Sequence, residues 1–219
     1  MKKHEFEHFA RNLPKTPGIF GREDFFNCAI LVPFVFIDEE GHLLFQKRAS
    51  TIRQGSEICF PGGKFDPHLD DSYRDTALRE TTEELGIPSE NIRITGRLDT
   101  MVTPRAVIVE PFVGILEIDS LDNLRPDPRE VAEVFTLPLA WFITAEPEVY
   151  HNRIEIQPSY IDAEGREHIL LPVDELGLPA RYKERRSEWT HKVVVYKNEK
   201  CTIWGLTAAI ILGMIRRMA

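Results

Sequence analysis

The sequence predicts an α/β fold, in which helices pack on a mixed β-sheet. Apolar segments with strand character lie on both sides of one clearly bounded helix, and a long apolar helix closes the chain. With 219 residues, 42% of them hydrophobic and 28% charged, the chain has the size and composition of one generous globular domain. We therefore expect a single domain over 1–219.

A short helix and a β-hairpin are expected at the start of the chain. Residues 4–13 carry apolar side chains at helical spacing. The dense apolar run 28–37 is typical of a buried strand, and 42–47 returns beside it after the turn 38–41. Pro33 has no amide hydrogen to donate to a neighbouring strand, so we expect an edge position or a bulge there.

One helix with clear ends follows the hairpin. Residues 70–72, Asp-Asp-Ser, are of the types that cap helix N-termini, and acids suit the positive end of the helix dipole. Gly86 stands where a C-terminal glycine cap is expected, and Pro88 prevents the helix from continuing.

The second half of the chain is expected to be less regular. Residues 144–188 are polar, with weak strands near 149–156 and 168–171 and a hairpin turn at 162–165, so we interpret them as an elaboration on the core. The other expected elements are strands over 92–102 and 107–118, a short helical or turn segment over 130–138, a brief helix over 139–143, a strand over 191–196 and a final helix over 202–218.

Three glutamates on the capped helix point to a metal site. Glu80, Glu83 and Glu84 fall at spacings that bring their side chains onto neighbouring faces, where like charges repel. A hard divalent cation would remove this repulsion by taking carboxylate oxygens, whereas the alternative is a solvated acidic face. Arg79 lies four residues before Glu83 and could orient it by a charge-assisted hydrogen bond. Just upstream, the loop 60–64, Phe-Pro-Gly-Gly-Lys, would let the backbone approach a phosphorylated ligand.

These residues carry a family resemblance. The stretch 79–87, Arg-Glu-Thr-Thr-Glu-Glu-Leu-Gly-Ile, resembles the second half of the signature of the Nudix hydrolases. The first half, from Gly63 to Arg79, is two residues longer than the signature, and Asp71 stands where its first Glu would align. The resemblance implies an α/β/α sandwich with a mixed central sheet. It also implies metal-dependent cleavage of the pyrophosphate bond of a nucleoside diphosphate derivative, with Mg²⁺ or Mn²⁺ as cofactor.

The site residues that we expect follow from this reading. A further carboxylate from elsewhere in the fold is usual in the family, and the candidates also have simpler solvent-facing or capping interpretations. The expected catalytic residues are Arg79, Glu80 and Glu83, the metal ligands Glu80, Glu83 and Glu84, the substrate-binding residues Arg48, Arg53, Gly62, Gly63 and Lys64, and the additional carboxylates Asp71, Glu110 and Glu130.

Upstream and closing segments resemble one branch of the family, the coenzyme A pyrophosphatases. The similar positions are 43–49, Arg53, 60–63 and 203–208, although Ser56 stands where the branch tends to have Gly. This resemblance implies cleavage of coenzyme A into 3′,5′-ADP and 4′-phosphopantetheine. Arg53 would suit the 3′-phosphate, unless it only fixes its own loop by pairing with an acid.

Two alternatives stay open for the function. One is a Nudix hydrolase of ADP-ribose, a dinucleotide or a nucleoside triphosphate. The other is a noncatalytic nucleotide-binding module that kept the fold and lost the chemistry.

The net charge and the cysteines indicate which binding partners and which cellular compartment to expect. A formal net charge of −8 argues against nonspecific nucleic-acid binding, because a phosphate backbone requires a basic face. The three cysteines are far apart, the N-terminus lacks an apolar signal-peptide core, and the longest apolar run is too short to span a bilayer. We expect a cytoplasmic protein with a small nucleotide substrate, no membrane partner, and a homodimer as an open alternative.

Overall fold

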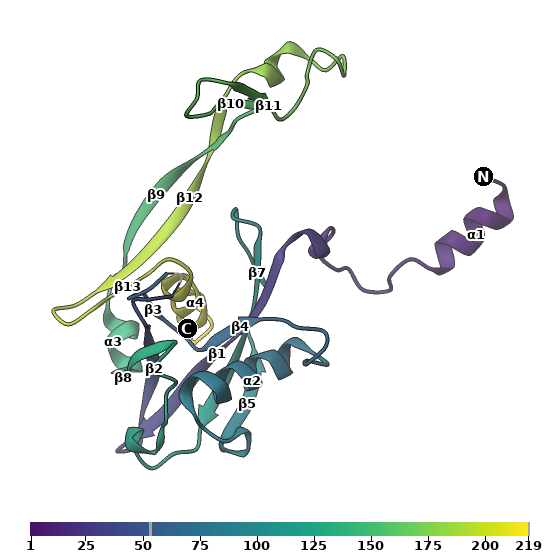
Figure 1. Ribbon diagram of the computed structural model, residues 1–219. Coiled ribbons are helices and arrows are strands. Elements are labelled where there is room, and N and C mark those ends of the chain that lie inside the picture. The colour runs from purple at the N-terminus through teal and green to yellow at the C-terminus, as the bar shows by residue number, and fades with distance from the viewer. Residues whose placement is uncertain (53, 219) are drawn as a thin grey trace.

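The body of the molecule is a mixed β-sheet between layers of helices (Figure 1). The computed structural model describes residues 1–52 and 54–218. The main path of the eight-stranded sheet runs β3-β2-β1-β7-β5, with β4, β6 and β8 pairing beside it. The strands are β1 (Phe26–Ile37), β2 (Glu40–Arg48), β3 (Ile58–Cys59), β4 (Gly62–Lys64), β5 (Ile92–Arg97), β6 (Met101–Val102), β7 (Val107–Leu116) and β8 (Val131–Pro138).

Strands β1 and β7 run parallel, whereas β1 and β2 form an antiparallel hairpin, so the prediction of a mixed sheet is confirmed. The helices are α1 (Lys3–Arg11), α2 (Tyr73–Leu85), α3 (Leu139–Thr144) and α4 (Gly205–Ile215), with short 3₁₀ turns η1 (Arg22–Asp24), η2 (Ser89–Asn91), η3 (Leu121–Asn123) and η4 (Ala180–Lys183). Among the described residues, none of these helices combines the length and the apolar character needed to cross a membrane.

Two hydrophobic cores lie on opposite faces of the sheet. Successive strand residues point to opposite faces, so Leu31 packs toward α2 while Val32 packs toward α4. The α2 side includes Leu85, and the α4 side includes Phe45 and Ile211. Because both faces are covered, β1 is apolar along most of its length, and the predicted α/β/α sandwich is confirmed.

The expectation of an edge position or bulge at Pro33 is wrong. Pro33 lies in the central strand β1, opposite Gly114 of β7. On its other side, β1 pairs with β4 over residues 28–30 and with β2 over residues 34–37. The amide of Leu31 points to that side, where it donates to the carbonyl of Pro61, and the backbone of Pro33 has the same orientation. The missing N–H therefore falls in the gap between two partner strands.

Three other segments differ from the sequence prediction. Residues 131–138, expected to be helical or a turn, form strand β8 along β2, where Phe135 lies opposite Phe45. The β-branched and aromatic residues of β8 favour a strand, and the edge of β2 supplies the partner. The region 92–102 is divided into β5 and β6, and the final helix begins at Gly205 because residues 202–204 form strand β13.

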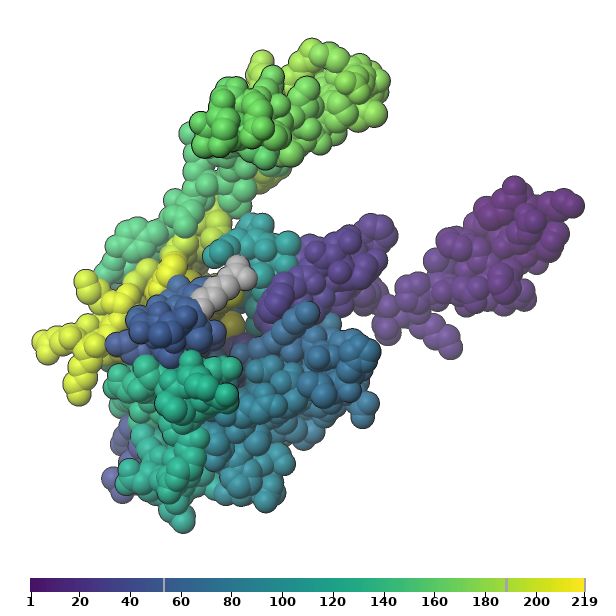
Figure 2. Space-filling view, viewed as in Figure 1, coloured from purple at the N-terminus to yellow at the C-terminus, as the bar shows by residue number. Residues whose placement is uncertain are grey.

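The region 144–188 contains more regular structure than expected. Strands β9 (Glu148–Ile156) and β12 (Arg186–Lys197) form a long antiparallel ribbon, with β13 (Thr202–Trp204) added at its base. A hairpin of β10 (Ser159–Ile161) and β11 (Glu167–Ile169) turns at its tip where predicted. We call residues 148–197 the arm, and Figures 1 and 2 show it extending away from the body.

The N-terminal helix is also set apart from the body. Helix α1 confirms the helix predicted over 4–13, but none of its residues is buried. Its apolar Phe6 and Phe9 contact each other and are about half exposed. Figure 1 shows α1 connected to η1 by an extended segment.

Candidate active site

Helix α2 presents the acidic residues, and its ends are those predicted. The hydroxyl of Ser72 accepts a hydrogen bond from the amide of Asp75, and Gly86 ends the helix with a φ of 62°. Thr81 and Leu85 are buried against the sheet. The face beside this stripe lies against β4, so the helix carries its glutamates to the glycine loop.

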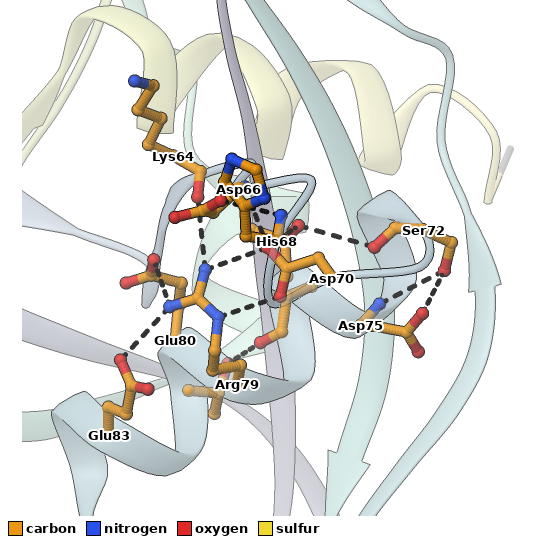
Figure 3. A network of polar contacts seen from close by, with 12 residues as sticks. Lys64, Asp66, His68, Asp70, Ser72, Asp75, Arg79, Glu80 and Glu83 are labelled. Atoms are coloured by element: carbon orange, nitrogen blue, oxygen red, sulfur yellow. Dashed lines mark hydrogen bonds and ion pairs between the residues drawn. The ribbon is translucent and has the colours of Figure 1, made fainter.

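Arg79 is the centre of a polar network at this face (Figure 3). Its Nε and Nη2 donate to the two carboxylate oxygens of Asp70, at 2.8 and 3.0 Å. Its Nη1 lies 2.8 Å from Oε1 of Glu80 and 3.2 Å from Oε2 of Glu83, and Nη2 also donates to the carbonyl of Lys64. Arg79 therefore contacts Glu83, as the spacing of four residues predicted, and contacts Glu80 as well.

Asp70 is a member of this site that the sequence reasoning missed. It is only 4% exposed, and its carboxylate also accepts hydrogen bonds from the Thr76 hydroxyl and the Asp66 amide. The Arg79 guanidinium lowers the pKa of Asp70 to about 2. Asp71, the carboxylate that was aligned with the signature, is exposed and forms no ion pair within the described part of the chain. Asp70 thus anchors the guanidinium that contacts Glu80 and Glu83.

Glu80 lies directly against the glycine loop. A Cβ atom placed on Gly63 would come within 2.4 Å of Cδ of Glu80, so no residue larger than glycine fits there without moving the carboxylate. Burial raises the pKa of Glu80, and the charges of Glu83 and Glu130 act in the same direction. Glu83 itself remains accessible, with 59% of its side chain exposed. The site therefore gathers more negative charge than Arg79 alone balances.

Glu84 connects the helix to the sheet. Its Oε2 accepts hydrogen bonds from the Gly62 amide and from Nε2 of Gln46, each at 2.9 Å. Gly62 has a φ of 149°, and a Cβ there would lie 2.4 Å from the carbonyl oxygen of Ala29. Glu84 is 4% exposed, and this burial raises its pKa to about 7.

Gln46 is a second residue that the sequence reasoning missed. It is 1% exposed in β2, directly after the buried apolar residues Leu43, Leu44 and Phe45. A polar side chain in such a strand has to find a hydrogen-bond partner, which was the available signal. The structure shows that this partner is Glu84.

The two additional candidate carboxylates differ in their environment. Glu110 lies beside Ala29 in the sheet and is 3% exposed, but Nη2 of Arg22 lies 2.6 Å from it and the Thr100 hydroxyl donates to it. Its charge is therefore already paired. Glu130 is exposed in the turn just before β8, and its charge contributes to the raised pKa of Glu80.

The candidate substrate-binding cations are spread around the site. Arg48 ends β2, and its charge lowers the pKa of Glu84, against the larger effect of burial. Lys64 is exposed, and its ammonium group points away from the Arg79 network in Figure 3. Arg53 lies outside the described residues.

The donor set fits a hard divalent cation. All candidate ligands supply carboxylate oxygens, which Mg²⁺ and Mn²⁺ accept, and the lack of a side chain at Gly63 lets the Glu80 carboxylate lie against the loop. Within residues 1–52 and 54–218, no three His, Cys, Asp or Glu side chains already surround a common point. Binding an ion would therefore require Glu80, Glu83 and Glu84 to shift toward it.

Comparisons with known proteins place this site in a family. The NUDIX domain model matches residues 29–193, which is more than half of the chain. Nudix hydrolase 3 of Caenorhabditis elegans is 35% identical over 142 residues, 61% of this chain and 58% of that protein. The uncharacterized Nudix hydrolase NudL of Photorhabdus laumondii is 31% identical over 186 residues, 84% of this chain and 81% of that protein.

A relative with a named substrate aligns over a shorter region. The peroxisomal coenzyme A diphosphatase NUDT7 of Mus musculus is 36% identical over 126 residues, 57% of this chain and 51% of that protein. The chain thus spans about half the length of the mouse and nematode relatives. Among solved structures, a MutT/nudix family protein from Enterococcus faecalis has a TM-score of 0.48 and 16% identity, covering 100% of this chain and 70% of that one. On the match of the family model, the chain belongs to the Nudix hydrolase family.

Proposed function

We propose that this chain is a metal-dependent pyrophosphohydrolase that cleaves coenzyme A or its derivatives into 3′,5′-ADP and 4′-phosphopantetheine. The observation that carries the proposal is the group of three glutamates on α2, tied to the glycine loop through Gly62 and Gly63. The substrate is suggested by the identity to the mouse coenzyme A diphosphatase.

Glu80, Glu83 and Glu84 would hold the Mg²⁺ or Mn²⁺ ions. A bound divalent ion neutralises phosphate oxygens and lowers the pKa of a coordinated water. Gln46 and Gly62 both donate to Oε2 of Glu84, so Oε1 is the atom that we assign to the metal ion.

Arg79 and Glu80 have separate tasks in this scheme. Asp70 holds the guanidinium of Arg79 from the side opposite the glutamates, so Arg79 orients the carboxylates of Glu80 and Glu83. Burial raises the pKa of Glu80, which is the direction that favours proton acceptance by a general base.

A substrate with several phosphates also needs cationic partners on a chain of net charge −8. Arg48 lies close enough to Glu84 to affect its pKa, so it would reach the diphosphate side of the site. Arg53 would bind the 3′-phosphate. We further infer a single domain over 1–219 with the arm as its elaboration, and a cytoplasmic location stays a prediction.

A substrate panel tests the proposal. The catalytic efficiency kcat/KM would be compared for coenzyme A, dephospho-coenzyme A, ADP-ribose, a dinucleotide and a nucleoside triphosphate, each with Mg²⁺ or Mn²⁺. Coenzyme A should be preferred, and Glu83→Gln should abolish most turnover. Glu90→Gln changes another exposed glutamate, which lies outside the site, and should leave turnover unchanged. Preference for another substrate would refute the substrate assignment alone. Absence of turnover on the whole panel would favour a noncatalytic binding module.

A further inference from the structure

The arm has a strand edge that no described segment covers. In the three-stranded sheet β13-β12-β9, strand β9 is at the outside, and β13 pairs only with residues 195–197 at the base of the arm. Beyond that base the arm is a two-stranded ribbon, which is marginally stable in water without further packing. Eight of the nine residues of β9 are exposed, and the strand contains neither Pro nor Gly to blunt its edge.

The charges along β9 are complementary to themselves. Arg153 and Glu155 lie two residues apart, so they project from the same face of the strand. Within the chain, Nε of Arg153 lies 3.7 Å from Oε1 of Glu155 and donates to the Ser187 hydroxyl, and Nη1 of Arg185 lies 3.5 Å from Oε2 of Glu155. Ion pairs on an exposed surface are weak, so these contacts can exchange for partners on a neighbouring strand. If a second β9 runs antiparallel to the first with Ile154 at the twofold axis, Arg153 of each copy lies opposite Glu155 of the other. Cross-strand pairs of opposite charge stabilise a sheet, and this register forms two of them by symmetry.

The opposite face of the ribbon is apolar at the same position. Trp189 of β12 lies beside Ile154 and is 51% exposed. In the twofold arrangement, two Ile154 side chains meet at the axis and a Trp189 flanks them on each side. A continuous apolar strip would then cross the four strands.

The same geometry brings the tip of each arm beside the base of the other. The tip exposes apolar Ile161 and Ile169, and the base exposes Ile143 and Trp204. Because the arms run in opposite directions, tip and base of different copies face each other and extend the interface beyond the paired strands. Figure 2 shows the arm clear of the body, so the approach of a second chain is not obstructed in that view.

We propose that two copies of this chain associate through their arms, with the β9 strands paired antiparallel about Ile154. The occupant of the free edge is therefore a second copy of the chain. This inference does not depend on the reaction that the chain catalyses.

Charge reversal in the full-length chain tests the arrangement by sedimentation equilibrium. The wild type should be a dimer, and Arg153→Glu should weaken it at least about tenfold, or about 1.4 kcal/mol, because both symmetric contacts become repulsive. Glu155→Arg should act in the same way, whereas the double change R153E/E155R should restore the dimer. A mixture of the two single variants should form heterodimers, since each then supplies the charges that the other lacks.

A matched control separates this effect from a general loss of charge pairing. Arg93 and Glu117 form another exposed cross-strand pair, at 2.8 Å, on β5 and next to β7. Arg93→Glu should leave the dimer unchanged, and thermal melting followed by circular dichroism should show that all variants are folded. A monomeric wild type, a dimer that the single reversals do not affect, or a double variant that fails to recover would each overturn the proposal.

Discussion

Replacing Glu84 by glutamine should make the metal-free protein more stable and the enzyme nearly inactive. The amide is the same size as the carboxylate and can still accept the hydrogen bonds from Gln46 and Gly62. It removes a charge from a position that is 4% exposed. Stability and activity should change in opposite directions, because the buried charge of Glu84 destabilises the metal-free fold but is proposed to hold the cation.

The size of the stability effect follows from the pKa of Glu84. Burial raises this pKa from 4.5 to about 7, so the folded state keeps the proton through that window while the unfolded state has lost it. The folded state then binds more protons, and stability falls as the pH rises from about 4.5 to 7. At pH 8 the ionised carboxylate costs about 3 kcal/mol, whereas near pH 5 it costs less than about 1 kcal/mol. The advantage of Glu84→Gln should therefore grow by about 2–3 kcal/mol between these conditions.

Urea unfolding at pH 5 and pH 8 in the presence of a chelator measures this difference. Added Mg²⁺ should reverse the order, because an ion that binds only the folded wild type stabilises that protein alone. Turnover of the variant should fall by at least about two orders of magnitude with the loss of a charged ligand. A stability difference that does not change with pH, or near-normal turnover, would refute the role assigned to Glu84.

Three further changes test other parts of the site. Asp70→Asn should lower kcat without preventing folding or substrate binding, because Arg79 loses its bidentate anchor and no longer orients Glu80. An unchanged kcat would show that the Asp70–Arg79 pair is only structural. Gly63→Ala should also lower kcat, because the new Cβ would lie 2.4 Å from the Glu80 carboxylate. Gly213→Ala is the control and should leave kcat unchanged, because a Cβ at Gly213 would have no other atom within 4 Å. Arg53→Ala should raise KM for coenzyme A about tenfold, the scale of one charge-assisted contact, and leave KM for dephospho-coenzyme A unchanged; an equal loss on both would place the 3′-phosphate elsewhere.

Features set by neighbours in the chain were predictable from the sequence. The ends of α2 depend on Ser72 and Gly86 at its own termini, and the Arg79–Glu83 contact depends only on helical spacing. The glycine loop was recognised for the same reason, since Gly62 requires a backbone conformation that few other residues adopt.

Contacts between distant segments were not predictable in this way. Asp70 resembles an ordinary helix-capping residue until the loop before α2 folds back and places it against Arg79. Strand β8 has β-branched and aromatic residues, but its sequence does not reveal that the edge of β2 is available to pair with it. Pro33 is tolerated in a central strand only because β4 and β2 leave a gap beside it, which a local rule about proline does not include.

The products formed from coenzyme A show whether the chain cleaves the pyrophosphate bond of this substrate with a metal ion. The wild-type chain would be incubated with coenzyme A and Mg²⁺, and separately with Mn²⁺, and the products identified by mass spectrometry. We predict equal amounts of 3′,5′-ADP and 4′-phosphopantetheine, and no cleavage when excess chelator is present. Intact coenzyme A with either metal, cleavage at a bond other than the pyrophosphate, or full turnover with chelator would contradict it.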